Sequence, residues 1–197
     1  MLRRRSSGYA PDRRSFAPEL NRIGGSALQA VGQHFAEAMQ IRHATEEDAT
    51  AMSGVLMRSL GDWGSSQRGD AAHERDFYIR HPDRIACHLA YDAGGACLEF
   101  QSLKLARAGN VYVVAPGWGI IGSYVDAQAR GLGAGRALFA ASLTAAQAAG
   151  LGSIDATIGA QNAAGLAYYG AIGFQDYRHT DASISKRYDL AGNDLSK

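Results

Sequence analysis

The sequence has few of the features that mark several large classes of protein. Only two of its 197 residues are cysteines, Cys87 and Cys97, and neither stands at metal-ligand spacing from other candidate ligands. We therefore expect reduced thiols in a cytoplasmic protein rather than a disulfide framework. No apolar run approaches the roughly 18 residues that a membrane span needs. No apolar stretch follows the arginines at positions 3–5, as a secretory signal would require.

An excess of charge of one sign is also absent. Twenty Lys and Arg residues against 19 Asp and Glu residues leave a net charge of +1. General nucleic-acid-binding proteins and polybasic membrane binders carry a clear positive excess, so we expect neither partner. Apolar residues make up 46% of the chain, enough for a domain with its own core. Glycine is abundant, at 24 residues without a period, which excludes collagen and points to places where the backbone turns or approaches a ligand.

The chain divides into three parts by composition. Residues 1–38 form an arginine-rich extension that we interpret as a flexible arm with a helix near its end. That helix fits a docking or dimerisation element, an additional helix, or a translation start placed too early, so a homodimer stays open. Residues 39–190 form the domain, and residues 191–197 form a short tail.

Hydrophobic patterning predicts an α/β order for residues 39–190. A first strand at 41–44 precedes a helix that Thr45 opens, and a loop with a short helix occupies 62–83. Further strands are expected at 85–91, 96–105 and 119–125, then at 154–158, 174–177 and 184–188, with helices at 135–149 and 163–172. Gly150 followed by Leu151 predicts a Schellman ending for the helix at 135–149. This order indicates an α/β domain on a mixed sheet.

A glycine-rich turn between the strand at 119–125 and the following helix carries the strongest functional signal. Such a turn presents backbone N–H groups at the positive end of a helix and favours a phosphate or pyrophosphate ligand. The turn does not match the Walker A motif, because Arg136-Ala137 stands where that motif needs Lys followed by Ser or Thr. The dinucleotide fingerprint fails at Arg136, and its first glycine comes too late after the strand, which disfavours a nucleotide-dependent oxidoreductase. The pattern [R/Q]-x-x-G-x-[G/A] of acyl-CoA-dependent N-acyltransferases matches fully, as Arg130-Gly131-Leu132-Gly133-Ala134-Gly135.

Two flanking motifs extend this match. The preceding Val125-Asp-Ala-Gln-Ala-Arg130 follows V-x-P-x-x-[R/Q] except at the proline. Downstream, the stretch from Asn162 to Phe174 follows N-x-x-A-x-x-[F/Y]-Y-x-x-x-G-F, with Gly165 in place of the alanine. On these motifs the chain resembles the GNAT superfamily of N-acetyltransferases over roughly residues 39–190. The resemblance implies a mixed, mostly antiparallel sheet of six to seven strands with flanking helices, acetyl-CoA as co-substrate, and no metal.

The resemblance also implies roles for individual residues. Backbone amides from Gly131 to Arg136 would hold the pyrophosphate, and the N–H of Ser123 would bind the thioester carbonyl. Tyr169 would be the general acid, because a phenol with a pKa of ~10 is protonated at neutral pH and can protonate a thiolate. Tyr168 is interpreted as a core residue. The implied cofactor-binding residues are Ser123, Tyr124, Val125, Arg130, Gly131, Leu132, Gly133, Ala134, Gly135, Arg136 and Asn162.

The general base is not fixed by the motifs. Many relatives carry a glutamate five positions before the asparagine, where this chain has Thr157. Asp155, Glu99 on a strand nearer the acceptor side, and an ordered water chain are the alternatives, and no base is assigned. Because neither motif contains a cysteine to carry the acyl group, we expect direct transfer in a ternary complex.

The acceptor is expected to be a primary amine on a small molecule or amino acid, bound between residues 45–83 and the strands that face them. Acidic residues there would attract an ammonium group, and aromatic residues would flank it. They are Asp62, Asp70, Glu74 and Asp76, with Trp63, Tyr78 and Trp118. His43 and His88 show no metal spacing. A non-catalytic acyl-CoA-binding or interaction module on the same fold is the alternative function.

Overall fold

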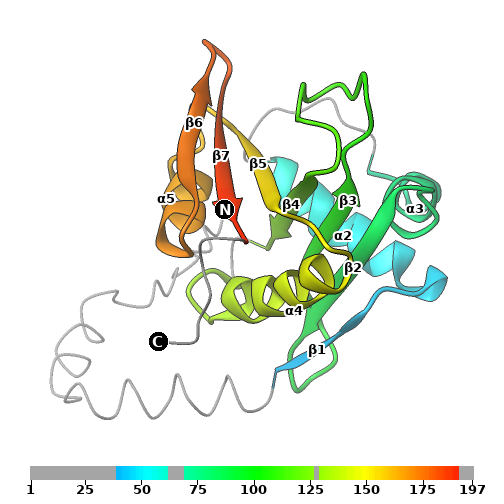
Figure 1. Ribbon diagram of the computed structural model, residues 1–197. Helices are drawn as coiled ribbons and strands as arrows, with labels where there is room; N and C mark the ends of the chain where they lie inside the picture. Colours follow the sequence, from blue (N-terminus) through cyan, green and yellow to red (C-terminus); the bar gives the residue numbers. More distant parts are fainter. Residues whose placement is uncertain (1–38, 62–68, 127–128, 191–197) are drawn as a thin grey trace, which may run out of the picture.

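The structure is a computed structural model that describes residues 39–61, 69–126 and 129–190 (Figure 1). The predicted extension at 1–38, the tail at 191–197 and the acceptor-site candidates Asp62 and Trp63 lie outside the described residues. Within those residues, no helix is long and apolar enough to cross a membrane.

One mixed sheet of seven strands organises the domain. Its strand order is β1-β2-β3-β4-β5-β7-β6, and every neighbouring pair is antiparallel except β4 and β5. The predicted mixed, mostly antiparallel sheet of six to seven strands is therefore confirmed. The strands are β1 (Gln40–His43), β2 (Arg84–Tyr91), β3 (Cys97–Leu105), β4 (Gly119–Val125), β5 (Ser153–Gly159), β6 (Gln175–His179) and β7 (Ser183–Asp189).

Helices cover both faces of this sheet (Figure 1). Phe100 of β3 packs in a core cluster with Met52 and Leu56 of α2, whereas Leu103 packs in a second cluster with Phe139 of α4. Phe100 and Leu103 stand three positions apart and so project from opposite faces of β3. The helical elements are η2 (Glu46–Asp48), α2 (Ala49–Gly61), α3 (Ala71–Glu74), η3 (Arg75–Ile79), α4 (Ala134–Ala148) and α5 (Ala163–Ala171).

The helix ends follow the chemistry that their sequences predict. Thr45 and Asp48 form a capping box at the start of η2, which runs directly into α2. At the other end of the domain core, Gly150 takes a φ of 68° after α4. The N–H of Leu151 donates to the carbonyl of Ala146 at 3.0 Å, which is the expected Schellman hydrogen bond. The capped helices α2 and α4 pack on opposite faces of β3 and β4.

Candidate active site

The edge of β4 that faces β5 is open over most of its length. The two parallel strands pair only where Gly119 meets Ile154 and Ile120 meets Asp155. Within the described residues, the rest of β4, from Ile121 to Val125, pairs with β3 alone. An extended ligand can add to such an edge as a further strand does.

Strand register shows which backbone groups reach this open edge. Just beyond β4, the N–H of Asp126 donates to the carbonyl of Leu98 at 2.9 Å. Hydrogen-bonded and non-hydrogen-bonded residue pairs alternate along an antiparallel ladder. Counting inward, the Gln101–Ser123 pair is non-hydrogen-bonded, as is the pair that Val125 makes with Glu99. The N–H and C=O groups of Ser123 and Val125 therefore point away from β3, toward the open edge.

The glycine-rich turn lies between this edge and α4. Gly131 and Gly133 have φ values of 82° and 86°, in the left-handed region that favours glycine. A Cβ atom built on either glycine meets no atom within 4 Å, so both face open space. Gly133 is the N-cap of α4. It has no side chain that could accept a hydrogen bond from the N–H groups in the first turn of this helix. Arg130 and Arg136 are exposed at the two ends of this turn.

The third glycine of the motif has a different role. A Cβ on Gly135 would lie 2.8 Å from a ring carbon of Tyr168 and 3.2 Å from Glu99 Oε1. The hydroxyl of Tyr168 donates to the carbonyl of Gly135 at 2.8 Å. Gly135 therefore lets α5 pack against the first turn of α4. Tyr168 packs against the core as expected, but its hydroxyl is also bound to the helix that begins after the glycine-rich turn.

Tyr169 lies beside the open edge of β4. Its ring is 6% exposed and packs against Phe174, with ring centroids 5.1 Å apart. Its hydroxyl lies 3.0 Å from Ser123 Oγ, and Gln101 Nε2 donates to the same Oγ at 2.7 Å. Burial raises the pKa of Tyr169, whereas the hydrogen bond with Ser123 lowers it. The phenol is protonated at neutral pH and stands at the strand end where the open backbone groups lie.

Asn162 begins α5 and is its N-cap. Its Oδ1 accepts a hydrogen bond from the N–H of Gly165 at 2.8 Å, which leaves the side-chain amide NH₂ group for another partner. A Cβ on Gly165 would lie 2.4 Å from Asn162 Nδ2, which explains why glycine suits this position, where the family pattern has alanine. Asn162 thus has a structural task besides any contact with a ligand.

The two residues weighed for the general base, Glu99 and Asp155, lie in different surroundings. Glu99 is on the α4 face of β3, with Gln101, because strand alternation places its side chain opposite that of Phe100. Burial raises its pKa to about 8. Asp155 is fully buried and accepts hydrogen bonds from Tyr177 and Thr157 at 2.8 and 3.0 Å.

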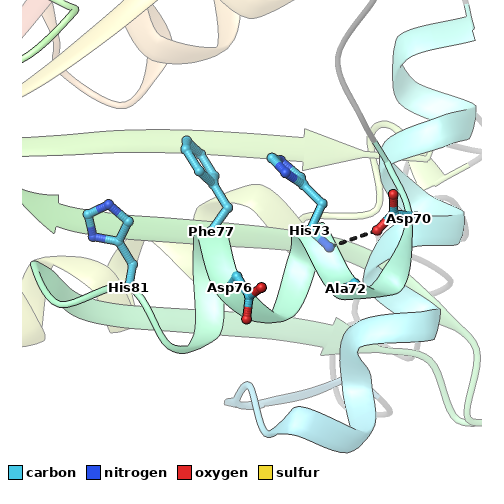
Figure 2. A pocket seen from close by; sticks show the side chains of 6 residues that line it. All are labelled: Asp70, Ala72, His73, Asp76, Phe77 and His81. Carbon is cyan, nitrogen blue, oxygen red and sulfur yellow. Dashed lines mark hydrogen bonds between the residues drawn. The ribbon is translucent and has the colours of Figure 1, made fainter.

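The acidic residues predicted on the acceptor side, Asp70, Glu74 and Asp76, lie in different surroundings along α3 and η3. Asp70 caps α3 by accepting from the N–H of His73, and Asp76 is exposed. Both line a surface pocket of about 300 Å³ with Phe77 and His81 (Figure 2). Glu74 instead is fully buried, and neither of its carboxylate oxygens has a hydrogen-bond partner among the residues that the structure describes.

The aromatic candidates for the acceptor side do not come together. Tyr78 packs against Phe100 and donates a hydrogen bond to the hydroxyl of Tyr124 at 2.8 Å. Trp118 packs instead against Tyr177, with ring centroids 5.7 Å apart, beside the β5–β7–β6 part of the sheet. Tyr78 therefore lies on the same side of the domain as Glu74, whereas Trp118 lies apart from both.

Sequence reasoning missed Gln101. This side chain is fully buried, and its Nε2 contacts both Ser123 and the Tyr168 hydroxyl, the latter at 3.3 Å. A signal was present, since Glu99 and Gln101 are polar residues at alternate positions of β3 and therefore share one face of the strand. The rings of His43 and His88 lie tilted to each other with their centroids 4.3 Å apart, and the described residues contain no group of three potential metal ligands.

Comparison with known proteins identifies this arrangement. The model of the acetyltransferase (GNAT) family matches residues 56–174, which is more than half of the chain. The chain belongs to the GNAT acetyltransferase family. Its members are acetyl-CoA-dependent acyltransferases, and the open β4 edge and the glycine-rich turn of this GNAT domain suit an extended, phosphate-bearing co-substrate. No curated protein matches the chain.

Solved structures share the fold of this GNAT domain at low identity. A GCN5-related N-acetyltransferase from Kribbella flavida is 20% identical, with a TM-score of 0.65 over 79% of this chain and 99% of that one. The protein yncA from Salmonella typhimurium, solved with acetyl-CoA, is 18% identical, with a TM-score of 0.64 over 78% and 94%. The paia N-acetyltransferase from Thermoplasma acidophilum, solved with coenzyme A, is 15% identical, with a TM-score of 0.60 over 77% and 99%.

Proposed function

We propose that this chain is an N-acetyltransferase that moves an acetyl group from acetyl-CoA to a primary amine of a small molecule, by direct transfer in a ternary complex. The observation that carries the proposal is the position of Tyr169, whose protonated hydroxyl lies 3.0 Å from Ser123 Oγ at the open edge of β4. A thioester held along that edge places its leaving sulfur near a proton donor. A cytoplasmic location and a homodimer stay predictions of the sequence.

The co-substrate is proposed to bind through backbone groups. The N–H of Ser123 would donate to the thioester carbonyl, and the open edge from Ser123 through Tyr124 to Val125 would pair with the pantetheine arm. The N–H groups from Gly131 to Arg136 would hold the pyrophosphate, in the space that Cβ atoms on Gly131 and Gly133 would enter.

Glu74 is proposed to receive the acceptor amine. Burial, with a smaller contribution from Asp70, raises the pKa of this unpartnered carboxyl to about 7. Burial raises the pKa values of Tyr78 and Tyr124, and the Glu74 carboxyl makes a smaller contribution in the same direction. Tyr124 follows Ser123 on β4 but projects from the opposite face. A buried carboxylate without a partner is unfavourable, and an ammonium group would satisfy it. This arrangement favours a cationic amine as acceptor.

Replacing Glu74 by glutamine is expected to change both stability and acceptor binding. The folded protein holds a proton on Glu74 that the unfolded chain releases at about pH 4.5, so wild-type stability falls as pH rises from 4.5 to 7. The loss is up to about 1.4 kcal/mol per pH unit. The free energy of unfolding of Glu74→Gln should not show this fall between pH 4.5 and 7. Its KM for a cationic amine should be at least roughly tenfold higher.

Denaturant unfolding at several pH values and acceptor kinetics check these two effects. Asp181→Asn is the matched control, since it also replaces a carboxyl by an amide, at an exposed site outside the predicted acceptor region. An unchanged acceptor KM in Glu74→Gln would remove Glu74 from the acceptor site.

Two substitutions of Asn162 should separate its two tasks. Asn162→Ala removes the helix cap and should cost about 1 kcal/mol of stability. Asn162→Asp keeps the capping oxygen but loses the amide donor, so stability should hold while acetyl-CoA affinity falls. Thermal unfolding and calorimetric titration measure both. Equal acetyl-CoA affinity in Asn162→Asp and wild type would limit Asn162 to the cap.

The first test of the proposed function is calorimetric titration of the purified chain with acetyl-CoA, with NADH and ATP as controls. Selective binding of acetyl-CoA, followed by thiol release when a panel of amines is added, is the expected result. Binding without thiol release from any amine would favour the non-catalytic acyl-CoA-binding module. Absence of acetyl-CoA binding by folded protein would contradict both.

A further inference from the structure

Five residues from four elements, with Tyr169 at one end, are linked by a chain of hydrogen bonds. The Tyr168 hydroxyl donates to the Gly135 carbonyl, and Gln101 Nε2 lies within reach of both the Tyr168 hydroxyl and Ser123 Oγ. Ser123 Oγ in turn lies 3.0 Å from the Tyr169 hydroxyl. We call the groups of Gly135, Tyr168, Gln101, Ser123 and Tyr169 the hydrogen-bond chain. It connects the first turn of α4, through α5 and β3, to β4.

The orientation of the Gln101 amide follows from Tyr168. A backbone carbonyl only accepts, so the single proton of Tyr168 is used in the 2.8 Å bond to Gly135. The Tyr168 oxygen can then only accept from Gln101, 3.3 Å away, and the Gln101 atom that faces it must be the NH₂ group. The second hydrogen of that group is donated to Ser123 Oγ, which lies 2.7 Å from Gln101 Nε2.

A hydroxyl can both donate and accept, so the bond between Ser123 Oγ and the Tyr169 hydroxyl can run in either direction. Ser123 Oγ accepts from Gln101, so its own proton is available to the Tyr169 oxygen, 3.0 Å away. With Ser123 as donor, the proton of Tyr169 is not used within the chain. We propose that Gln101, Ser123 and Tyr168 are positioning residues that direct the Tyr169 proton toward the leaving sulfur; this rests on the proposed function.

The step that this arrangement serves is balanced. As the acceptor nitrogen bonds to the acetyl carbon, the carbon–sulfur bond breaks and the sulfur takes the Tyr169 proton to give the CoA thiol. The phenolate oxygen keeps the hydrogen bond from Ser123, which stabilises its charge. The proton that leaves the acceptor nitrogen restores the phenol. Burial alone would make Tyr169 a poor acid, so a donor to its oxygen is needed.

The inference can be tested with CoA alone, without turnover. If Tyr169 directs its proton to the sulfur, binding should lower the pKa of the CoA thiol, which ultraviolet absorbance of the thiolate reports. In Ser123→Ala this pKa should rise by about one pH unit relative to wild type, a tenfold change in ionisation. Tyr168→Phe keeps the ring but frees the Gln101 amide to rotate, and it should raise the pKa in the same direction.

Two variants control for simple structural damage. Ser123→Thr keeps the hydroxyl and should restore the wild-type thiol pKa. Tyr91→Phe removes a hydroxyl that bonds to Asp48 at 2.8 Å, outside the hydrogen-bond chain, and should leave the thiol pKa unchanged. With an amine that supports turnover, Ser123→Ala should lower kcat roughly tenfold and leave the dissociation constant of acetyl-CoA within about twofold.

The outcomes separate the two levels of the proposal. Equal thiol pKa values in wild type, Ser123→Ala and Tyr168→Phe, with CoA bound to all three, would overturn the role of the hydrogen-bond chain alone. Wild-type protein that fails to bind CoA would overturn the proposed function, and this inference with it. A raised pKa in both variants, restored in Ser123→Thr, is the result that supports it.

Discussion

Gly133→Asp is expected to reduce acetyl-CoA affinity more than about 100-fold, since like charges about 4 Å apart repel by about 4 kcal/mol near a protein surface. The introduced carboxylate would occupy the space in which no atom lies within 4 Å of a Cβ on Gly133. Any side chain at the φ of 86° that Gly133 adopts strains the backbone, but aspartate tolerates a left-handed φ better than most residues. The free protein should therefore stay folded, with a lower thermal midpoint than wild type.

Gly133→Asn isolates the charge. Asparagine has nearly the same shape, the same tolerance of positive φ and the same capping ability, but no negative charge. We expect it to lose far less affinity than Gly133→Asp in calorimetric titrations at matched salt. If the two variants bound acetyl-CoA equally well, the N-terminus of α4 would not be the pyrophosphate site.

The fold was largely predictable because its boundaries are marked by local chemistry. The predicted limits of β4, 119–125, agree with the structure, and Gly150 ends α4 through the expected Schellman bond. These features depend on residues close together in the sequence, such as a glycine that alone accepts a positive φ. The strand order and the place of the single parallel pair were not predicted, because local periodicity does not encode which strands pair, and the family resemblance implied only a mixed, mostly antiparallel sheet.

The candidate site was predictable where a motif spans adjacent residues, and not where strands bring distant residues together. The glycine-rich turn and Tyr169 stand in such motifs. Gln101 carries no motif, and its contact with Ser123 exists because the two face each other across β3 and β4. Likewise, the face on which Glu99 lies follows from strand register, where one step reverses a side chain's direction.

The burial of Glu74 shows the same limit on the acceptor side. Asp70, Glu74 and Asp76 look equivalent in the sequence, as acidic residues within seven positions. The helical path of α3 and η3 exposes Asp70 and Asp76 to solvent and buries Glu74 completely. Helix rotation therefore buries one carboxyl of the three, and burial raises the pKa of Glu74 to about 7.

Tyr169→Phe is expected to lower kcat about 100-fold or more, which is what a positioned proton donor contributes. The ring should keep its packing against Phe174, because phenylalanine differs from tyrosine only by the hydroxyl. The dissociation constant of acetyl-CoA should stay within about twofold, since the proposed binding groups are backbone amides elsewhere. Steady-state kinetics with a screened amine, and calorimetry with acetyl-CoA, measure the two quantities.

The dependence of kcat on the basicity of the leaving thiolate distinguishes an acid from a packing residue. If Tyr169 donates the proton, Tyr169→Phe should depend on the basicity of the leaving thiolate more steeply than wild type, so thioesters of more acidic thiols should recover much of the lost rate. Tyr168→Phe makes the same chemical change next to it and should keep a larger share of kcat, because it acts only through Gln101. A wild-type kcat in Tyr169→Phe would show that another group protonates the thiolate, and the assignment of Tyr169 as general acid would be wrong.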